Sequence, residues 1–290
     1  MKETATREFP RRVAIENTTA CNARCTMCPR EKLRRKIETM DLPTFKRLLD
    51  DAVAAGASKI SLHNFGEPLL DKDLAAKIAC AKDKGVRETY IVTNASLMTE
   101  EKAEELIEAG LDRVKISFYG VTPEEYETIH AGLSYETTLA NIKALLAAKK
   151  RLGGKKPKIT LRYIGGPIDF LKFCRQWLPY WPTCSVVPGT FHNYSSGRNF
   201  NPISKIRRPD RMKSCRYLKR SVVYILANGD VVPCCYDFNG VLNMGNALEE
   251  NIADIWHGPR FQAFRLAHKN HEFHKYPICA ACDKLNCIFI

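Results

Sequence analysis

The chain up to about residue 190 alternates between two spacings of apolar residues. Short, mostly apolar runs are typical of strands, and apolar residues that recur every three to four positions are typical of helices. The runs that predict strands are Val13–Asn17, Lys59–His63, Glu88–Thr93, Arg113–Phe118, Lys158–Ile164 and Cys184–Val187. The segments between them that predict helices are Leu42–Ala55, Leu74–Lys84, Thr99–Gly110, a helix that opens at Thr122, Tyr135–Arg151 and Asp169–Trp177. Strands that alternate with helices in this way form a parallel sheet with crossover helices.

The number of these units predicts an open barrel. A closed barrel of eight strand–helix units typically takes about 250 residues. The pattern here ends after six strands, so we expect an α/β fold with a partial (β/α)6 TIM-type barrel. The carboxyl ends of parallel strands carry the active site in such folds, and we expect the same here.

After Pro188 the pattern changes, which predicts a second, smaller domain. Residues 189–214 are rich in Gly, Ser, Asn, Pro and Arg and are typical of a linker. Two strands joined by Asn228-Gly229 predict a hairpin, and residues 251–268 predict a helix. We therefore expect a barrel domain at 1–197 and a cysteine-rich domain at 198–290.

Composition adds two features to this picture, because the 290 residues include 12 cysteines and carry a formal net charge of +13. Residues 1–12 are polar, and no apolar run reaches the roughly 18 residues of a membrane span, so we expect a cytoplasmic protein without signal peptide or membrane helix. Cysteines stay reduced in the cytosol. Cysteines at short spacings in such a chain therefore indicate metal ligands rather than disulfides.

The basic excess lies partly in two runs, residues 149–158 and 198–220, the second with nine Lys or Arg against one acid. One interpretation is a solvated surface. The other is attraction of an anionic partner, such as a phosphorylated substrate, an acidic peptide or RNA.

Three cysteines follow the first predicted strand at C-x3-C-x2-C spacing: Cys21, Cys25 and Cys28, which we call the cysteine loop (residues 21–28). Three thiolates can hold three corners of a cubane iron–sulfur cluster, which normally takes four cysteines. The fourth iron then stays open to a small molecule. A zinc site is the alternative, but zinc sites mostly pair C-x2-C with a second Cys/His pair.

A second group, the auxiliary cysteines, consists of Cys215, Cys234, Cys279 and Cys282. Four thiolates suit either a closed iron–sulfur cluster or a structural zinc ion. Cys235 and Cys287 are further candidate ligands or buried thiols.

The cysteine loop and a second motif resemble the radical S-adenosylmethionine superfamily. The spacing matches the cluster motif of that family, including a hydrophobic residue, Met27, before the last cysteine. Gly66-Glu67-Pro68, after the second predicted strand, matches its Gly-Glu motif. Thr93-Asn94 and Ser117, at the ends of the third and fourth strands, are similar to family positions that contact the cofactor.

This resemblance implies a cofactor site. Cys21, Cys25 and Cys28 would hold a [4Fe-4S] cluster, and the amine and carboxylate of S-adenosylmethionine would chelate its open iron. Gly66 and Glu67 would engage the amine, Met27 would pack on the adenine, and Asn94 and Ser117 would reach the ribose or carboxylate. Such enzymes generate a 5′-deoxyadenosyl radical that abstracts hydrogen from the substrate.

The auxiliary cysteines resemble the SPASM family, because Cys215-x13-Gly229-x4-Cys234 matches the opening of its motif. The full motif holds two auxiliary clusters through further cysteines, whereas only Cys279, Cys282 and Cys287 follow here. The pattern fits the shorter "twitch" variant, which implies one auxiliary [4Fe-4S] cluster on Cys215, Cys234, Cys279 and Cys282.

Four other residues are candidates on position alone. Arg162 on the fifth strand and His192 after the sixth would point to the open face, as substrate contacts or as packing and loop residues. Cys184 and Cys235 are candidates for a thiol that returns hydrogen to a substrate radical, against the alternative of buried thiols.

The resemblance favours an oxidoreductase or epimerase that acts on a sugar- or aminocyclitol-type small molecule, with an external electron donor such as flavodoxin or ferredoxin. The alternative is a maturase of a ribosomal peptide. A third hypothesis is a basic RNA-binding iron–sulfur protein without radical chemistry, but no known RNA-binding module is visible, so we expect no nucleic-acid partner.

Overall fold

The computed structural model describes residues 8–189, 194, 215 and 222–282. Its eight-stranded sheet has the order β6-β5-β4-β3-β2-β1-β7-β8. Neighbouring strands from β6 to β7 are parallel, and only β8 runs antiparallel to its neighbour. The strands are β1 (Arg12–Ile15), β2 (Lys59–Ser61), β3 (Glu88–Thr93), β4 (Arg113–Ser117), β5 (Lys158–Ile164), β6 (Cys184–Gly189), β7 (Val222–Ile225) and β8 (Val231–Val232).

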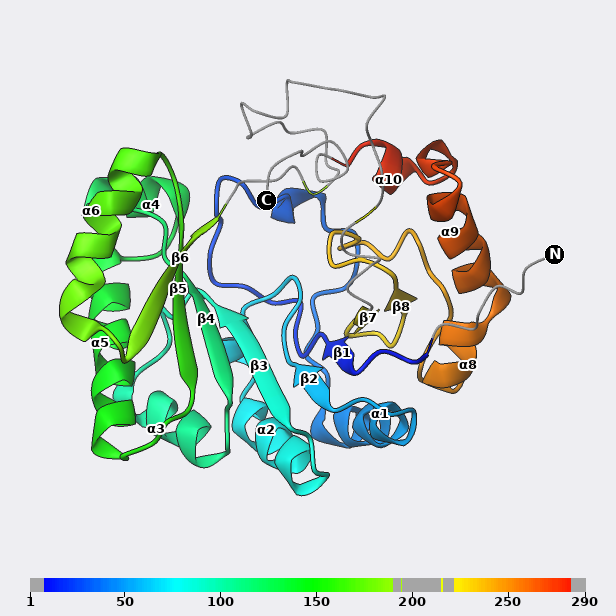
Figure 1. Ribbon diagram of the computed structural model, residues 1–290, viewed down its shortest axis with the longest axis horizontal. Coiled ribbons are helices and arrows are strands. Elements are labelled where there is room, and N and C mark those ends of the chain that lie inside the picture. The colour runs from blue at the N-terminus through cyan, green and yellow to red at the C-terminus, as the bar shows by residue number, and fades with distance from the viewer. Residues whose placement is uncertain (1–7, 190–193, 195–214, 216–221, 283–290) are drawn as a thin grey trace.

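Helices cover the outer side of the curved sheet (Figure 1). They are α1 (Leu42–Ala54), α2 (Leu74–Asp83), α3 (Glu100–Glu108), α4 (Pro123–Ile129), α5 (Tyr135–Arg151) and α6 (Pro167–Trp177). Local sequence sets where they begin: Thr99 caps α3 by accepting from the Lys102 amide, and Pro123 occupies the first turn of α4. The predicted partial barrel of strand–helix units is confirmed.

The inner face of the barrel sheet lines a cavity and does not pack as a closed core. Along β3, Ile91 is buried against the helices, whereas Tyr90 and Val92, on the other face, are half-buried. The guanidinium groups of Arg12 and Arg113 lie over the Tyr90 ring, 5.6 and 5.4 Å from its centroid. The open sheet therefore leaves room for a site at its concave face.

The C-terminal region continues the barrel sheet, which sequence patterning did not predict. The predicted hairpin is present as β7 and β8, and β7 pairs in parallel with β1 from Arg12↔Val222 to Ile15↔Ile225. Figure 1 shows α8 (Ile252–His257), α9 (Pro259–Lys269) and α10 (Pro277–Ala280) beyond this edge. The proposed domain boundary at 197/198 lies outside the described residues.

The helical segment predicted for 251–268 is confirmed, and the structure divides it into two helices at Gly258. Gly258 adopts an extended conformation, with φ −67° and ψ 165°, and caps α9, whose first residue is Pro259. Proline lacks the amide that a continuous helix would use and instead favours a helix start. Within the described residues, no helix is long and apolar enough to span a membrane.

Candidate functional site

A pocket of about 320 Å³ lies at the carboxyl ends of the barrel strands, beneath the cysteine loop. Val92 and Thr93 of β3, Ser117 of β4 and Arg162 of β5 line it, together with residues 63–67 after β2. The C-terminal region contributes Tyr224, Cys235 and Tyr236. The strand ends therefore meet at one site, as the alternating pattern predicts.

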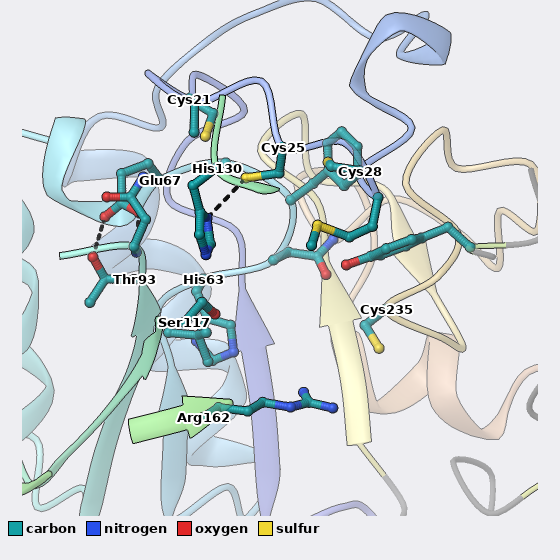
Figure 2. Close-up of a pocket in the computed structure, with 18 of the residues that line it drawn as sticks. Cys21, Cys25, Cys28, His63, Glu67, Thr93, Ser117, His130, Arg162 and Cys235 are labelled. Carbon is teal, nitrogen blue, oxygen red and sulfur yellow. Dashed lines mark hydrogen bonds between the residues drawn. The ribbon is translucent and has the colours of Figure 1, made fainter. Parts of the chain in front are cut away.

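The three cysteines of the loop all line this pocket (Figure 2). The Glu67 amide donates to the Ala20 carbonyl at 2.7 Å, which fixes the start of the loop against the segment after β2. Gly66 is required for this approach, because a Cβ there would collide with the carbonyl oxygens of Thr18 and Ala20. Close backbone packing therefore explains the glycine of the Gly-Glu motif, whether or not a ligand binds.

The loop thiols match a cubane cluster in number. Such a cluster takes one thiolate on each of several irons, and three thiols leave one iron open. Burial and the neighbouring thiols raise the pKa of Cys25 and Cys28 to about 12, so metal binding must displace their protons.

Glu67 is a buried carboxylate in the pocket wall, 3% exposed. Its oxygens accept hydrogen bonds from Thr93 Oγ1 at 2.6 Å, the Asn94 amide at 2.8 Å and the Leu69 amide at 3.1 Å. Burial outweighs these bonds and raises the pKa of Glu67 to about 7. A cationic group in the pocket would restore its charge.

The other residues predicted for the cofactor divide into two kinds. Met27 is buried with Tyr119 and Ile164 in a small apolar cluster at the pocket wall, and Ser117 also lines the pocket. The Asn94 side chain is held by protein groups, since its amide donates to Asn22 Oδ1 at 3.0 Å and its oxygen accepts from Ser96. Asn94 therefore ties the cysteine loop to the end of β3.

Unpaired polar groups lie opposite the cysteine loop. His63 Nδ1 and both amide atoms of Asn64 are buried and have no hydrogen-bond partner in the described part of the chain. Arg162 points across the pocket (Figure 2), and a Cβ at Gly189 would collide with its guanidinium. His192, the other predicted substrate contact, lies outside the described residues.

The auxiliary cysteines lie near one another. Burial, together with the adjacent Cys282 and Cys215 thiols, raises the pKa of Cys279 to about 12. Cys234 interacts with Cys215 and is hydrogen-bonded to Cys235, which together with burial raises its pKa well above the usual range. Cys287 lies outside the described residues.

Cys235 lines the pocket, and its side chain is also hydrogen-bonded to that of Cys234, which precedes it in sequence. It lines the cavity together with the cysteine loop, and Figure 2 shows it across the site from Glu67. The buried Tyr194 phenol lies near both Cys28 and Cys235. Cys184 is not brought to the pocket: it begins β6, pairs with Ile159 at the opposite end of the sheet and is buried in the core.

Sequence reasoning missed two buried residues: His130, which lines the pocket, and Glu16, which accepts from the amide of the pocket residue Phe65. Glu16, directly after β1, forms a two-point ion pair with Arg35 at 2.7 and 3.0 Å. His130, after α4, contacts Cys25, and burial lowers its pKa to about 3, so its ring is neutral. Only their position after a strand and a helix could have drawn attention to them, because neither forms a motif.

Family models match two parts of the chain. Residues 15–169, slightly more than half of the chain, match the model of the radical SAM superfamily. Residues 215–283 match SPASM, an iron–sulfur cluster-binding domain. The first match includes the cysteine loop and the Gly-Glu motif, and the second includes all four auxiliary cysteines.

Two curated proteins are similar over almost the whole chain. The S-adenosyl-L-methionine-dependent 2-deoxy-scyllo-inosamine dehydrogenase of Niallia circulans is 26% identical, covering 94% of this chain and 93% of that protein. The PqqA peptide cyclase of Granulibacter bethesdensis is also 26% identical, covering 97% and 81%.

Solved structures show the same fold. BtrN in complex with AdoMet and 2-DOIA aligns with a TM-score of 0.66 and 23% identity, covering 94% of this chain and 93% of that one. SuiB of Streptococcus suis, bound to the precursor peptide SuiA, aligns with a TM-score of 0.64 and 17% identity, covering 96% and 71%. The chain therefore belongs to the radical S-adenosylmethionine superfamily, carries a SPASM-type iron–sulfur domain, and has S-adenosylmethionine and two [4Fe-4S] clusters as its cofactors.

Proposed function

We propose that this protein dehydrogenates a hydroxyl-bearing carbon of a small polar molecule of the sugar or aminocyclitol class. The observation that carries the proposal is the composition of one pocket. The cysteine loop, the unpaired polar atoms of His63 and Asn64, the Arg162 side chain, and a thiol next to the auxiliary cysteines all line the same cavity. The similarity to a 2-deoxy-scyllo-inosamine dehydrogenase over almost the full length of both chains supports this class of substrate.

The residues around the cysteine loop fit the first cluster and S-adenosylmethionine. Cys21, Cys25 and Cys28 would hold three irons, and the buried Glu67 would receive the cofactor's amine, since a cation is what its carboxylate lacks. Met27, with Tyr119 and Ile164, offers an apolar surface for the adenine.

Gly66, Asn94 and Ser117 are assigned lesser roles in the same proposal. Gly66 allows the backbone to approach the loop, Asn94 holds the loop through Asn22, and Ser117 supplies a hydroxyl at the pocket wall. When bound, S-adenosylmethionine and the cluster of the cysteine loop would supply the radical chemistry that removes a hydrogen atom from the substrate, and the auxiliary cluster would supply an acceptor for the remaining electron.

The auxiliary cysteines fit the second cluster by number and proximity. Four thiols, Cys215, Cys234, Cys279 and Cys282, would leave no iron open, which suits electron transfer. Cys235 would stay a thiol between the two cluster sites, because it faces the pocket.

The substrate would lie toward Arg162, His63 and Asn64. Buried donors and acceptors without partners cost free energy until a ligand pairs with them. A ring that carries hydroxyl or amino groups can satisfy an amide, an imidazole nitrogen and a guanidinium together, and the Arg162 guanidinium also suits an anionic substituent.

An external electron carrier of the flavodoxin or ferredoxin type would reduce the cluster of the cysteine loop. We propose that the protein works in the cytoplasm, where its thiols stay reduced.

The test is reduction of the reconstituted full chain in deuterated water with S-adenosylmethionine and a panel of aminocyclitols and sugars. We expect one 5′-deoxyadenosine for each ketone formed and no solvent deuterium in recovered substrate. A product epimer that carries solvent deuterium, lost in Cys235→Ala, would instead identify an epimerase. No cleavage of S-adenosylmethionine would contradict radical chemistry altogether.

Peptide maturation is the second candidate function, favoured by the similarity to a PqqA peptide cyclase over 97% of this chain. A peptide encoded beside its gene would then become crosslinked or oxidised in the same assay, with its mass lowered by the hydrogens removed. Absence of binding to such a peptide, together with turnover of a small molecule, would exclude this function.

A further inference from the structure

His130 lies directly beneath the cysteine loop, at the C-terminal end of α4. It is 1% exposed, and its backbone amide donates to the Tyr126 carbonyl at 2.7 Å, which closes the helix. Its ring packs between two tyrosines, with centroid distances of 4.8 Å to Tyr119 and 4.5 Å to Tyr126. The ring therefore has a fixed position and orientation.

Both ring nitrogens of His130 have partners, and one partner decides the tautomer. The Tyr119 backbone amide, which can only donate, lies 3.3 Å from Nε2. Nε2 must therefore be the acceptor, and the proton of the neutral ring is on Nδ1. Nδ1 lies 3.4 Å from the Sγ atom of Cys25, as Figure 2 shows, so this nitrogen donates to the sulfur.

The backbone on both sides of His130 holds the cysteine loop in register. The Arg24 amide donates to the Ala131 carbonyl at 2.8 Å, and the Thr26 amide donates to the Ile129 carbonyl at 3.0 Å. These two bonds flank Cys25 on the loop and His130 on the segment after α4. The contact between the two side chains is therefore part of a paired structure.

We propose that His130 is a positioning residue that donates a hydrogen bond to the sulfur of Cys25 and thereby makes the cluster of the cysteine loop easier to reduce. A donor to a cluster sulfur stabilises negative charge, and the reduced cluster carries one more negative charge than the oxidised one. The inference rests on the proposed assignment of Cys25 as a cluster ligand. It adds a residue outside the cysteine motif that controls the entry of the electron.

Three variants separate the hydrogen bond from packing. His130→Phe keeps a ring between the tyrosines but removes the donor. His130→Asn keeps an N–H near the position of Nδ1. Tyr126→Phe is the matched control, because it removes the 3.0 Å hydrogen bond from the Tyr126 hydroxyl to Thr138 and leaves the contact with Cys25 intact.

The main measurement is a redox titration of the reconstituted full chain, followed by electron paramagnetic resonance. Addition of S-adenosylmethionine identifies the cluster with the open iron. At a fixed potential, we expect His130→Phe to lower the ratio of reduced to oxidised cluster by about tenfold, His130→Asn to restore most of it, and Tyr126→Phe to leave it unchanged. An unchanged ratio in His130→Phe would overturn the proposal, as would equal losses in His130→Phe and His130→Asn.

A second measurement does not need the cluster. Nitrogen chemical shifts of 15N-histidine in the metal-free full chain report the tautomer of His130. We expect a protonated Nδ1 and an unprotonated Nε2, and the opposite tautomer would overturn the proposal. Iron counting on Cys25→Ser, where we expect about four fewer irons, tests the ligand assignment separately, so that its failure can be told apart from failure of the hydrogen bond.

Discussion

At the scale of the residue, the site contains charges whose behaviour is set by burial. Glu67 accepts three hydrogen bonds from neutral donors but is paired with no cation among the described residues, and its pKa rises to about 7. The spacing of the motif identified this residue, whereas its raised pKa depends on how deeply the chain buries it. The ordinary pKa of a glutamate side chain is 4.5.

Glu67→Gln should change how stability depends on pH. Between pH 4.5 and about 7 the folded chain holds a proton on Glu67 that the unfolded chain has lost, so the free energy of unfolding falls as pH rises through this window. The resulting loss in the free energy of unfolding is up to about 3 kcal/mol, and the whole loss is reached above about pH 8. Denaturant unfolding of the metal-free chain at pH 5, 6, 7 and 8 measures it as the difference between wild type and Glu67→Gln.

Glu108→Gln is the matched control for this prediction, because it makes the same chemical change at an exposed position on α3. If the free energies of unfolding of the wild type and of Glu67→Gln differ by the same amount at every pH, the raised pKa of Glu67 is contradicted.

At the scale of the element, the end of β1 joins three parts of the chain. The Glu16 carboxylate accepts from Arg35, from the Phe65 amide after β2 at 3.2 Å and from the Ala227 amide after β7 at 3.0 Å. Arg35 also donates to the Phe238 carbonyl at 2.7 Å. One ion pair, fully buried at Glu16 and 7% exposed at Arg35, therefore connects the barrel, the segment after the cysteine loop and the C-terminal region.

Arg35→Met should destabilise the fold by about 3–5 kcal/mol, because it leaves the Glu16 carboxylate buried without its counter-charge. Arg151→Met is the matched control: Arg151 pairs with Glu100 and Glu104 but is 53% exposed, so we expect a loss of less than about 1 kcal/mol. Denaturant unfolding of both variants measures the difference.

The double variant Glu16→Gln/Arg35→Met isolates the coupling between the two charges. We expect it to be less destabilised than the sum of the two single variants, since neither charge is then left alone. Equal losses in the free energy of unfolding for Arg35→Met and Arg151→Met would show that burial does not strengthen the Glu16–Arg35 ion pair.

At the scale of the whole molecule, sheet continuity brings Cys235 of the C-terminal region to the pocket that the cysteine loop lines. The parallel pairing of β7 with β1 sets the C-terminal hairpin beside the first barrel strand. The turn after β8 then carries Cys234 toward the other auxiliary cysteines and Cys235 toward the cysteine loop. Cys234 and Cys235 are therefore adjacent in the sequence, but only Cys235 lines the pocket.

Iron content should distinguish these two thiols. The wild type should bind about eight irons, Cys279→Ser about four, and Cys235→Ser about eight, because only the first removes a proposed cluster ligand. Iron and sulfide analysis of anaerobically reconstituted protein, normalised to protein concentration, measures this. About four irons in Cys235→Ser and about eight in Cys279→Ser would reverse the assignment.

The sequence by itself determined the strand–helix alternation, the helix starts at Thr99 and Pro123, and the motifs from Cys21 to Cys28 and at Gly66-Glu67, because each depends on neighbours within a few residues. Spacing could also assign Cys215, Cys234, Cys279 and Cys282 to one group. Contacts across the fold were decided by tertiary structure alone: the docking of β7 on β1, the Glu16–Arg35 pair and the His130–Cys25 hydrogen bond join residues 19 to more than 200 positions apart. Such contacts have no local signal, since any strand edge or buried side chain could make them until packing selects one partner.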